Sequence, residues 1–483
     1  MKDKIISDVI VSTVVKIAQK GRGIFFIPII TFYLGTSAYG AYAQLLVVTN
    51  LFAGIFGLGL HAGLIRYFQR CTDKKEKCII YFDVLAFVAL IGFAISAILY
   101  FYSSQISTLT LGDTEYTAMY QMGSVLVPLS ILNRIVKNYY KSSRFLKLYS
   151  IIDGLKTYVT IGMVSYIVVI MSGSLSDVVT AIIGIEICFF LILQADVIRR
   201  IGITVPKFQT IPGIFDYSAL FMISQVSSGF LSRADRLLIG YFLGPTAVGV
   251  YTTAYKVSNL ILLFALPLNN SFFPEFSNLW EDGESQRAIQ YLNSGVRYFL
   301  TLCVPSILGF LLVGESLLRL IAPESIAVQA ANLLPALGIG IALWSLIRLY
   351  SSLFFAAESP KRIASIRFSG AVINVILNAI LIPILGLFGA VITTVVSYLL
   401  VLSVILLWSR SKLGIHSHFP GVNKIGTAAI LMYILARQLW IENIWFTILS
   451  SAVLYFIILY GIGGVSRDEI TLIIRSLRDI ISS

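Results

Sequence analysis

The sequence predicts an all-α polytopic membrane protein with fourteen transmembrane helices, from its composition, its apolar segments and the placement of its basic residues. Hydrophobic residues make up 57% of the 483 residues and charged residues only 12%, and the mean hydropathy is +0.87. A soluble protein carries about 25% charged residues, so this chain has half the charge that a water-facing surface needs. The composition therefore excludes the soluble, disordered and fibrous classes.

A transmembrane helix needs about 20 mostly apolar residues, and fourteen segments of the chain meet this requirement. The outer loops between them are at most about fifteen residues long, which is too short for a separate domain. The predicted spans are Val11–Leu34, Tyr42–Ile65, Ile79–Tyr102, Met119–Val136, Tyr149–Met171, Val178–Ile198, Phe215–Phe242, Val250–Leu268, Tyr298–Val313, Gln329–Phe355, Ile363–Leu385, Gly389–Trp408, Ile425–Leu439 and Ile444–Gly463.

Basic residues fall on one side of the predicted membrane. With the N-terminus on the inner side, the inner segments hold 25 of the 36 Lys and Arg residues, and the outer loops hold only Arg319. Because this bias sets the orientation of a membrane protein, we expect both termini in the cytoplasm. Most of the net charge of +12 is thus an orientation signal, and ten basic residues remain within or beside the spans.

Two stretches of the sequence resemble each other at an offset of 209 residues. Tyr33–Asn50 and Phe242–Asn259 are identical at seven of eighteen positions, and both fall at the outer turn between the first two spans of a set of six. Because an even number of spans separates the copies, the repeat predicts two six-helix lobes in parallel orientation, related by a pseudo-two-fold axis along the membrane normal. We expect an N-lobe at 1–208, a C-lobe at 209–408, and two further spans with a cytoplasmic tail at 409–483.

With this architecture the chain resembles the multidrug/oligosaccharidyl-lipid/polysaccharide exporter superfamily, and within it the flippases that move polysaccharide repeat units of the O-antigen type. The residues that carry the resemblance are Lys16–Gly23, Phe32–Tyr42, Ser232–Gly244 and Val248–Lys256. The resemblance implies alternating-access movement of an undecaprenyl-diphosphate-linked oligosaccharide across the bacterial inner membrane, as in lipopolysaccharide biosynthesis. It further implies a cation-lined cavity for the anionic diphosphate headgroup, contact with membrane lipids, H⁺ or Na⁺ as the coupling ion, and a polysaccharide polymerase as a partner.

Three other functions remain open. A lipid II flippase or a cation-coupled drug exporter would have the same fold, although the drug-export branch typically has twelve spans and acidic membrane residues. A membrane polysaccharide polymerase or ligase would act on the same glycolipid but typically needs a sizeable outer loop for catalysis. Because the outer loops here are short and the spans are basic, we expect a secondary transporter rather than an enzyme.

Charged side chains inside a bilayer are costly, and they usually face a cavity or pair with each other. In the first span, Lys16 and Lys20 share one helix face and Arg22 lies roughly opposite. By analogy with the superfamily, the spans that begin the two lobes line a central cavity, where Lys and Arg are natural counter-ions of a diphosphate. The further candidates for substrate binding, in spans seven, eight and ten, are Gln225, Arg233, Asp235, Arg236, Lys256, Asn259 and Arg348.

Most of these residues also have a structural interpretation. Lys16, Lys20 and Lys256 could extend to an interface, and Asp235 could form a structural ion pair with a neighbouring arginine. Arg348 follows Trp344 by four residues and could form a cation–π pair with it.

Other polar residues in the spans have weaker functional signals. Arg134 lies near the end of its span, which favours an anchoring role, and Lys156 is a looser candidate for substrate binding. His61 is expected to be a core histidine that forms a hydrogen bond. Gly59 and Gly63 have the spacing of a helix-packing motif.

Carboxylates within the spans are candidates for ion coupling. Glu186 lies in the middle of the sixth span among apolar residues, and burial without a partner favours the protonated form of a carboxyl group. Glu186 and Asp235 are therefore the predicted ion-coupling residues. Asp83 lies near an inner end and is expected to pair with cations of the loops.

Motifs for other chemistry do not occur in the sequence. It has no P-loop, His-Glu-x-x-His or Gly-x-Ser-x-Gly motif, so we expect no catalytic residue and no cofactor. Cys71 and Cys78 do not have a zinc spacing, and His416 and His418 have no further ligand nearby, so no metal site is expected. No nucleic-acid partner is expected either.

Overall fold

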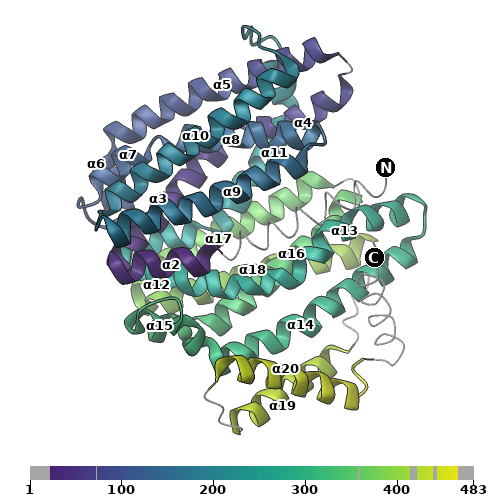
Figure 1. Cartoon of the computed structure of the whole chain (residues 1–483). Coiled ribbons are helices and arrows are strands. Elements are labelled where there is room, and N and C mark those ends of the chain that lie inside the picture. Colours follow the sequence, from purple (N-terminus) through teal and green to yellow (C-terminus); the bar gives the residue numbers. More distant parts are fainter. Residues whose placement is uncertain (1–21, 72, 357–358, 414–420, 439–442, 466–483) are drawn as a thin grey trace. The chain divides into compact units, whose positions relative to one another are not determined.

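The computed structural model describes residues 22–71, 73–356, 359–413, 421–438 and 443–465, and contains no strand among them (Figure 1). The helices are α2 Arg22–Tyr33, α3 Gly35–Phe56, α4 Leu60–Arg70, α5 Lys74–Phe101, α6 Ser103–Leu111, α7 Thr117–Gly123, α8 Leu126–Ser142, α9 Leu146–Ser165, η1 Tyr166–Ile170, α10 Leu175–Ile201, α11 Ile211–Leu231, α12 Ala234–Ser258, η2 Asn259–Ile261, α13 Leu262–Glu281, α14 Ser285–Arg319, α15 Glu324–Ala331, α16 Leu334–Ala356, α17 Pro360–Leu385, α18 Leu387–Leu413, α19 Val422–Gln438 and α20 Ile444–Gly461.

Within the described residues, each predicted span coincides with one helix or with two or three consecutive helices, while residues 11–21 of the first span lie outside them. Among the described residues, ten helices are long and apolar enough to cross a membrane. The prediction of an all-α polytopic membrane protein is therefore confirmed. Some spans are interrupted: the second consists of α3 and α4, and the seventh breaks between α11 and α12 at Ser232 and Arg233.

The chain packs into two compact units. The first comprises Met1–Thr253, Ile321–Ile326 and Ala364–Thr393, and the second comprises Ala254–Leu320, Ala327–Ile363 and Thr394–Ser483. The first unit thus includes α11 and most of α12, which the repeat assigns to the C-lobe. The predicted lobes, with boundaries at residues 208 and 408, follow the sequence repeat and differ from these two units. The lobe division stays a prediction.

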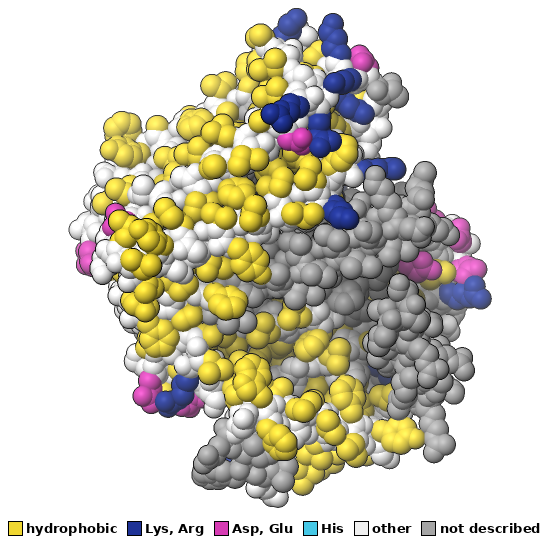
Figure 2. All heavy atoms as spheres, in the orientation of Figure 1, with side chains coloured by type: hydrophobic (Ala, Val, Ile, Leu, Met, Phe, Trp, Pro, Cys, Tyr) yellow, Lys and Arg dark blue, Asp and Glu magenta, His cyan; other side chains and the backbone are white. Residues whose placement is uncertain are grey.

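The side chains on the outside of the helices are those expected in lipid. On α5, Leu90, Phe93 and Phe101 are exposed by 63%, 55% and 78%. Figure 2 shows hydrophobic side chains across the sides of the helices in view, while Lys and Arg gather at one end of α5 and α10. Burying so much apolar surface in lipid instead of water is favourable by about 25 cal/mol per Å², which explains the low charge content of the chain.

A tyrosine cluster forms part of the core of the first unit, where α5 packs along α8. Tyr81, Tyr139 and Tyr140 are at most 1% exposed, and their rings pack edge to face at 5.4 and 5.5 Å. The Tyr81 hydroxyl donates to Gln194 on α10 at 2.6 Å, and the Tyr140 hydroxyl donates to Asp196 at 2.6 Å. The hydroxyl groups of Tyr81 and Tyr140 are thus hydrogen-bonded although they are buried. These hydrogen bonds join α5 and α8 to α10.

A buried carboxylate of α5 fixes the linker before α11. Asp83 is fully buried and accepts hydrogen bonds from the backbone N–H groups of Lys207 (2.8 Å), Phe208 (3.1 Å) and Thr210 (3.3 Å). The Thr210 hydroxyl donates a further bond at 3.0 Å. The predicted pairing of Asp83 with loop cations is therefore wrong: the carboxylate binds backbone and sets where α11 starts.

The two copies of the sequence repeat meet in the first unit through their glycines. Gly35 and Gly244, which align in the repeat, both have positive φ angles of 88° and 79°. Gly40 and Gly249 also align, and each allows the other copy's turn to approach closely. A methyl group at Gly249 would lie 2.6 Å from the Thr36 carbonyl oxygen, and one at Gly40 would overlap the Pro245 carbonyl oxygen. The contact is reciprocal, as a pseudo-two-fold relation between the copies requires.

The last two helices form an appendage in the second unit. α19 and α20 lie side by side against α14 (Figure 1). Arg297 of α14 donates to the Gly464 carbonyl at 2.7 Å, and Lys424 of α19 donates to the Gly463 carbonyl at 2.9 Å. Cations thus bind the carbonyls just after the C-terminus of α20, where the helix dipole is negative.

We predict that Gly249→Ala destabilises the protein, because the added methyl group would overpack a backbone contact. Such changes cost about 1–3 kcal/mol, so thermal unfolding in detergent should begin several degrees lower than in the wild type. Gly184→Ala on α10 is the matched control, because nothing lies within 4 Å of the added methyl group there. Equal melting temperatures for the two variants would contradict the close contact.

Candidate functional site

A polar cavity lies inside the first unit, between α3, α8 and the end of α11. Its volume is about 80 Å³, and its polar lining residues are Asn50, Arg134, Gln225 and Arg233. This is enough room for several water molecules or for a phosphate-sized group. All ten residues that line it belong to the first unit, and none of them is an Asp or Glu. The cavity therefore brings two guanidinium groups together, and the described residues of its lining include no carboxylate.

Arg233 reaches the cavity because a helix breaks inside a predicted span. α11 ends at Leu231 and α12 begins at Ala234, so Ser232 and Arg233 form a turn between them. Non-helical backbone at membrane depth is tolerated only where protein or water-filled space surrounds it. A break next to a polar cavity fits this rule.

Close helix packing positions α11 against α4. A methyl group at Gly59 would lie 2.7 Å from the Ser218 carbonyl oxygen, and one at Gly63 would lie 2.5 Å from the Ser218 hydroxyl oxygen. The glycine spacing that predicted a packing motif is thus used between α4 and α11. This approach places Gln225, two turns further along α11, at the cavity.

Arg134 enters the cavity from α8. Its Nη1 atom lies 3.5 Å from the Ala53 carbonyl oxygen near the end of α3, and its charge is within Coulombic range of Arg233. Asn50 on α3 uses its amide nitrogen within its own helix, donating to the Leu46 carbonyl at 2.7 Å. Two like charges near one cavity repel each other, and an anion bound there would relieve the repulsion.

Asp235 is buried beside a tyrosine in the same unit. It is 4% exposed and accepts hydrogen bonds from the Tyr251 hydroxyl (2.5 Å) and the Arg236 backbone N–H (2.8 Å). The residues 209 positions earlier are Phe26 and Tyr42, whose rings pack 5.2 Å apart. The repeat therefore places a carboxylate where the first copy has a phenyl ring, which is a chemical difference between otherwise equivalent positions.

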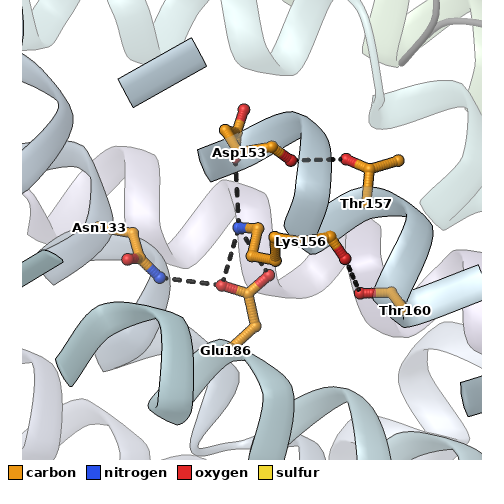
Figure 3. Close-up of polar contacts among 6 residues, drawn as sticks. All are labelled: Asn133, Asp153, Lys156, Thr157, Thr160 and Glu186. Atoms are coloured by element: carbon orange, nitrogen blue, oxygen red, sulfur yellow. Dashed lines mark hydrogen bonds and ion pairs between the residues drawn. The ribbon is translucent and has the colours of Figure 1, made fainter. Parts of the chain in front are cut away.

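Glu186 lies in a cluster of charges on α8, α9 and α10 (Figure 3). The Lys156 ammonium lies 3.0 Å from Glu186 and 3.5 Å from Asp153, and Asn133 donates to Glu186 at 2.9 Å. The side chains of the ion pair are 20% and 26% exposed. The premise that Glu186 lacks a partner is therefore wrong, although its coupling role stays a prediction. Lys156 is held between two carboxylates, which makes it a poor ligand for an anionic cargo.

The other predicted residues are distributed over several parts of the chain. Lys16 and Lys20 lie outside the described residues, and Arg22 begins α2. Gln225 and Arg233 are the predicted substrate-binding residues that the structure brings together at the cavity, and Asp235 and Arg236 follow at the start of α12. The predicted candidates in the second unit are Lys256, Asn259 and Arg348.

Two residues of the second unit have a defined setting. Asn259 donates to the Tyr255 carbonyl at 2.8 Å, as Asn50 does at the equivalent position of the first copy. Arg348 is exposed on α16, and the Trp344 ring packs against Tyr398 at 5.4 Å. The Trp344 ring thus has an aromatic partner in Tyr398, and its pairing with Arg348 stays a prediction.

Sequence reasoning missed Arg134 and Asn50 as cavity residues. Arg134 was expected to be an interfacial anchor because it lies near the end of a predicted span. The polar residues Asn133, Arg134 and Asn138 interrupt the apolar segment of α8. This pattern indicates a polar environment inside the span better than the position of Arg134 near its end. Asn50 lies in the repeat, where its match to Asn259 was visible.

Two family models match the chain. The one described as polysaccharide biosynthesis protein matches residues 5–280, and the one described as lipid II flippase MurJ matches residues 167–461. Each match covers more than half of the 483 residues.

Curated relatives match shorter stretches. The probable low-salt glycan biosynthesis flippase Agl15 of Haloferax volcanii is 26% identical over 193 residues, which is 40% of this chain and 41% of the relative. The probable flippase AglR of the same organism is 28% identical over 170 residues, 34% of this chain and 35% of the relative. The probable lipid II flippase MurJ of Rhizobium meliloti is 26% identical over 225 residues, 41% of each chain. The chain thus matches less than half the length of each relative.

Solved structures show the same fold. A lipid II flippase MurJ in an inward closed conformation superposes with a TM-score of 0.81 and 14% identity, over 93% of this chain and 98% of that one. An inward-facing multidrug resistance MATE transporter of the MOP superfamily superposes with a TM-score of 0.68 and 14% identity, over 82% and 94%. At this identity the likeness establishes the fold alone.

We predict that Lys156→Met destabilises the protein, because Glu186 and Asp153 would be left as neighbouring carboxylates without a cation. Removing one partner of a fully buried pair costs about 3–5 kcal/mol, and the partial exposure of this pair lowers the expectation to about 1–3 kcal/mol. Thermal unfolding followed by tryptophan fluorescence measures the change.

The double variant Lys156→Met/Glu186→Gln serves as the internal control for this prediction. It removes one negative charge together with the positive one, so part of the lost stability should return. If the single variant melted like the wild type, the charge cluster would not hold α9 to α10.

Proposed function

Since the chain belongs to the polysaccharide biosynthesis protein family and is a flippase of the MOP superfamily, we propose that it translocates undecaprenyl-diphosphate-linked oligosaccharide repeat units of the O-antigen type. The movement is across the bacterial inner membrane, by alternating access, with both termini in the cytoplasm. The observation that carries this proposal is the cavity whose described lining brings Arg134 and Arg233 together with the amides of Asn50 and Gln225.

The chemistry of the cavity suits a phosphate-bearing headgroup. A guanidinium presents a planar fork of N–H donors that matches phosphate oxygens, and it keeps its charge in a dry environment. Charge-assisted hydrogen bonds of this kind contribute about 1.5–3 kcal/mol each. Gln225 and Asn50 add amide groups at the same cavity, and these can bind either phosphate or sugar hydroxyl groups.

A lipid II flippase is the second candidate, because the MurJ model matches residues 167–461. Both candidates require an anionic lipid-linked cargo, so they share the cavity and differ in the attached sugar. A drug exporter is less suited, since two arginines would repel a cationic drug from this cavity. The glycan biosynthesis flippases among the relatives support the repeat-unit cargo over lipid II.

For energy coupling we propose H⁺ or Na⁺ at Asp235 or Glu186. Asp235 is buried in the same unit as the cavity and differs from its repeat equivalent by carrying a charge. Glu186 belongs to a cluster with two carboxylates and one ammonium group, which has an excess of negative charge. A cation or proton would neutralise either group, which is the property that coupling requires.

We predict that Arg134→Gln and Arg233→Gln each slow translocation by about tenfold or more, because each removes a charge-assisted contact. The measurement is movement of a fluorescent prenyl-diphosphate saccharide across proteoliposome membranes containing the full chain. Arg437→Gln is the control, since Arg437 is an exposed arginine of α19 that does not line the cavity. Wild-type rates in both cavity variants would refute the proposed headgroup site.

We predict that removing the coupling carboxylate abolishes gradient-driven accumulation but leaves downhill exchange. Asp235→Asn and Glu186→Gln are tested in proteoliposomes under an imposed pH or Na⁺ gradient. Glu315→Gln is the control, since Glu315 pairs with Arg319 at an exposed site. If both variants kept the wild-type response to both gradients, neither residue would couple transport to an ion.

A further inference from the structure

One face of α8 carries polar residues from its basic end to the cavity. Arg134, Asn138 and Lys141 are spaced at i, i+4 and i+7, so they lie on the same side of the helix. Lys141 is exposed, whereas Asn138 and Arg134 are half-buried. The face thus leads from the surface to a residue that lines the cavity.

A histidine on the neighbouring helix lies beside this face. α4 packs against α8, and half-buried His61 at the start of α4 is within Coulombic range of both Arg134 and Lys141. Both charges that act on His61 are positive. His61 thus adds a polar group on α4 within electrostatic range of both cations.

Other cations nearby are engaged elsewhere. The Lys137 ammonium, also on α8, lies over the Tyr149 ring at 5.6 Å. Lys156 is held between Glu186 and Asp153. Lys137 lies on the same side of α8 as Arg134 and Lys141, and its contact with the Tyr149 ring is what distinguishes it from them.

We propose that Lys141, His61 and Arg134 form an entry track, which guides a phosphate-bearing anionic headgroup from the basic end of α8 into the cavity at Arg233. The inference rests on the proposed function, and it adds a route to the site. Seven residues of helix span about 10 Å, which is close to the Debye length of about 8–10 Å at physiological salt. A headgroup leaving Lys141 would therefore already feel the field of Arg134.

Such a track would act on the rate of association. Charges that steer a ligand raise its on-rate, and salt weakens the effect, whereas contacts in the bound state mainly set the off-rate. Lys141 should thus influence association at low salt only. His61, which contributes a hydrogen bond rather than a steering charge in this scheme, should influence association at any salt concentration.

The test uses the full chain in phosphatidylcholine nanodiscs and farnesyl diphosphate as the probe, with association and dissociation followed by stopped-flow fluorescence. Lys141→Gln should slow association about threefold at low salt, with an unchanged off-rate, and the difference should vanish at high salt. His61→Leu should slow association at both salt concentrations. Lys75→Gln is the control, because it removes the same charge from an exposed position on α5, a helix that contributes no residue to the cavity lining.

Three results would overturn the track: an unchanged on-rate in Lys141→Gln, an equal loss in Lys75→Gln, or a change confined to the off-rate. The proposed function fails in a different way. If Arg134→Gln and Arg233→Gln bound farnesyl diphosphate as tightly as the wild type, the cavity would not be the headgroup site. If those variants lost affinity while Lys141→Gln associated normally, only the track would be wrong.

Discussion

A charged side chain within hydrocarbon must pair with an opposite charge or face water. This constraint explains the surroundings of each charged residue in the first unit. Lys156 meets it by pairing with Glu186 and Asp153. Asp235 meets it through the Tyr251 hydroxyl and a backbone N–H. Arg134 and Arg233 meet it at a polar cavity whose described lining offers no carboxylate. The two arginines thus form a cationic lining that suits an incoming anion.

The two copies of the sequence repeat are similar in backbone structure but differ in the chemistry of one position. Gly40 and Gly249 form a reciprocal backbone contact, so the first turns of both copies meet as equivalent structures. The chemistry differs at Phe26 and Asp235, which take equivalent positions beside a buried tyrosine. One copy thus has an apolar contact where the other has a buried carboxylate. The repeat therefore combines equivalent turns with a chemical difference at equivalent positions.

The fold could be predicted from sequence because its signals are local. Apolar length, basic loops and the glycines of the repeat each lie in short stretches, and they predicted the helices and the repeat. The site was harder, because its partners are distant in sequence: Glu186 pairs with a lysine 30 residues away and an asparagine 53 residues away. Arg134 was misjudged for the same reason, since its cavity is formed with residues of α3 and α11. Periodicity indicates which residues share a helix face but not which helix packs against it.

The central claim is that Arg134 and Arg233 hold an anionic headgroup, and a structure with a bound ligand tests it most directly. The full chain in nanodiscs with farnesyl diphosphate can be imaged by electron cryo-microscopy. The account predicts density for the diphosphate between the two guanidinium groups, with the prenyl chain leading away from the cavity. Density for the diphosphate at another site, with an empty cavity between Arg134 and Arg233, would contradict it.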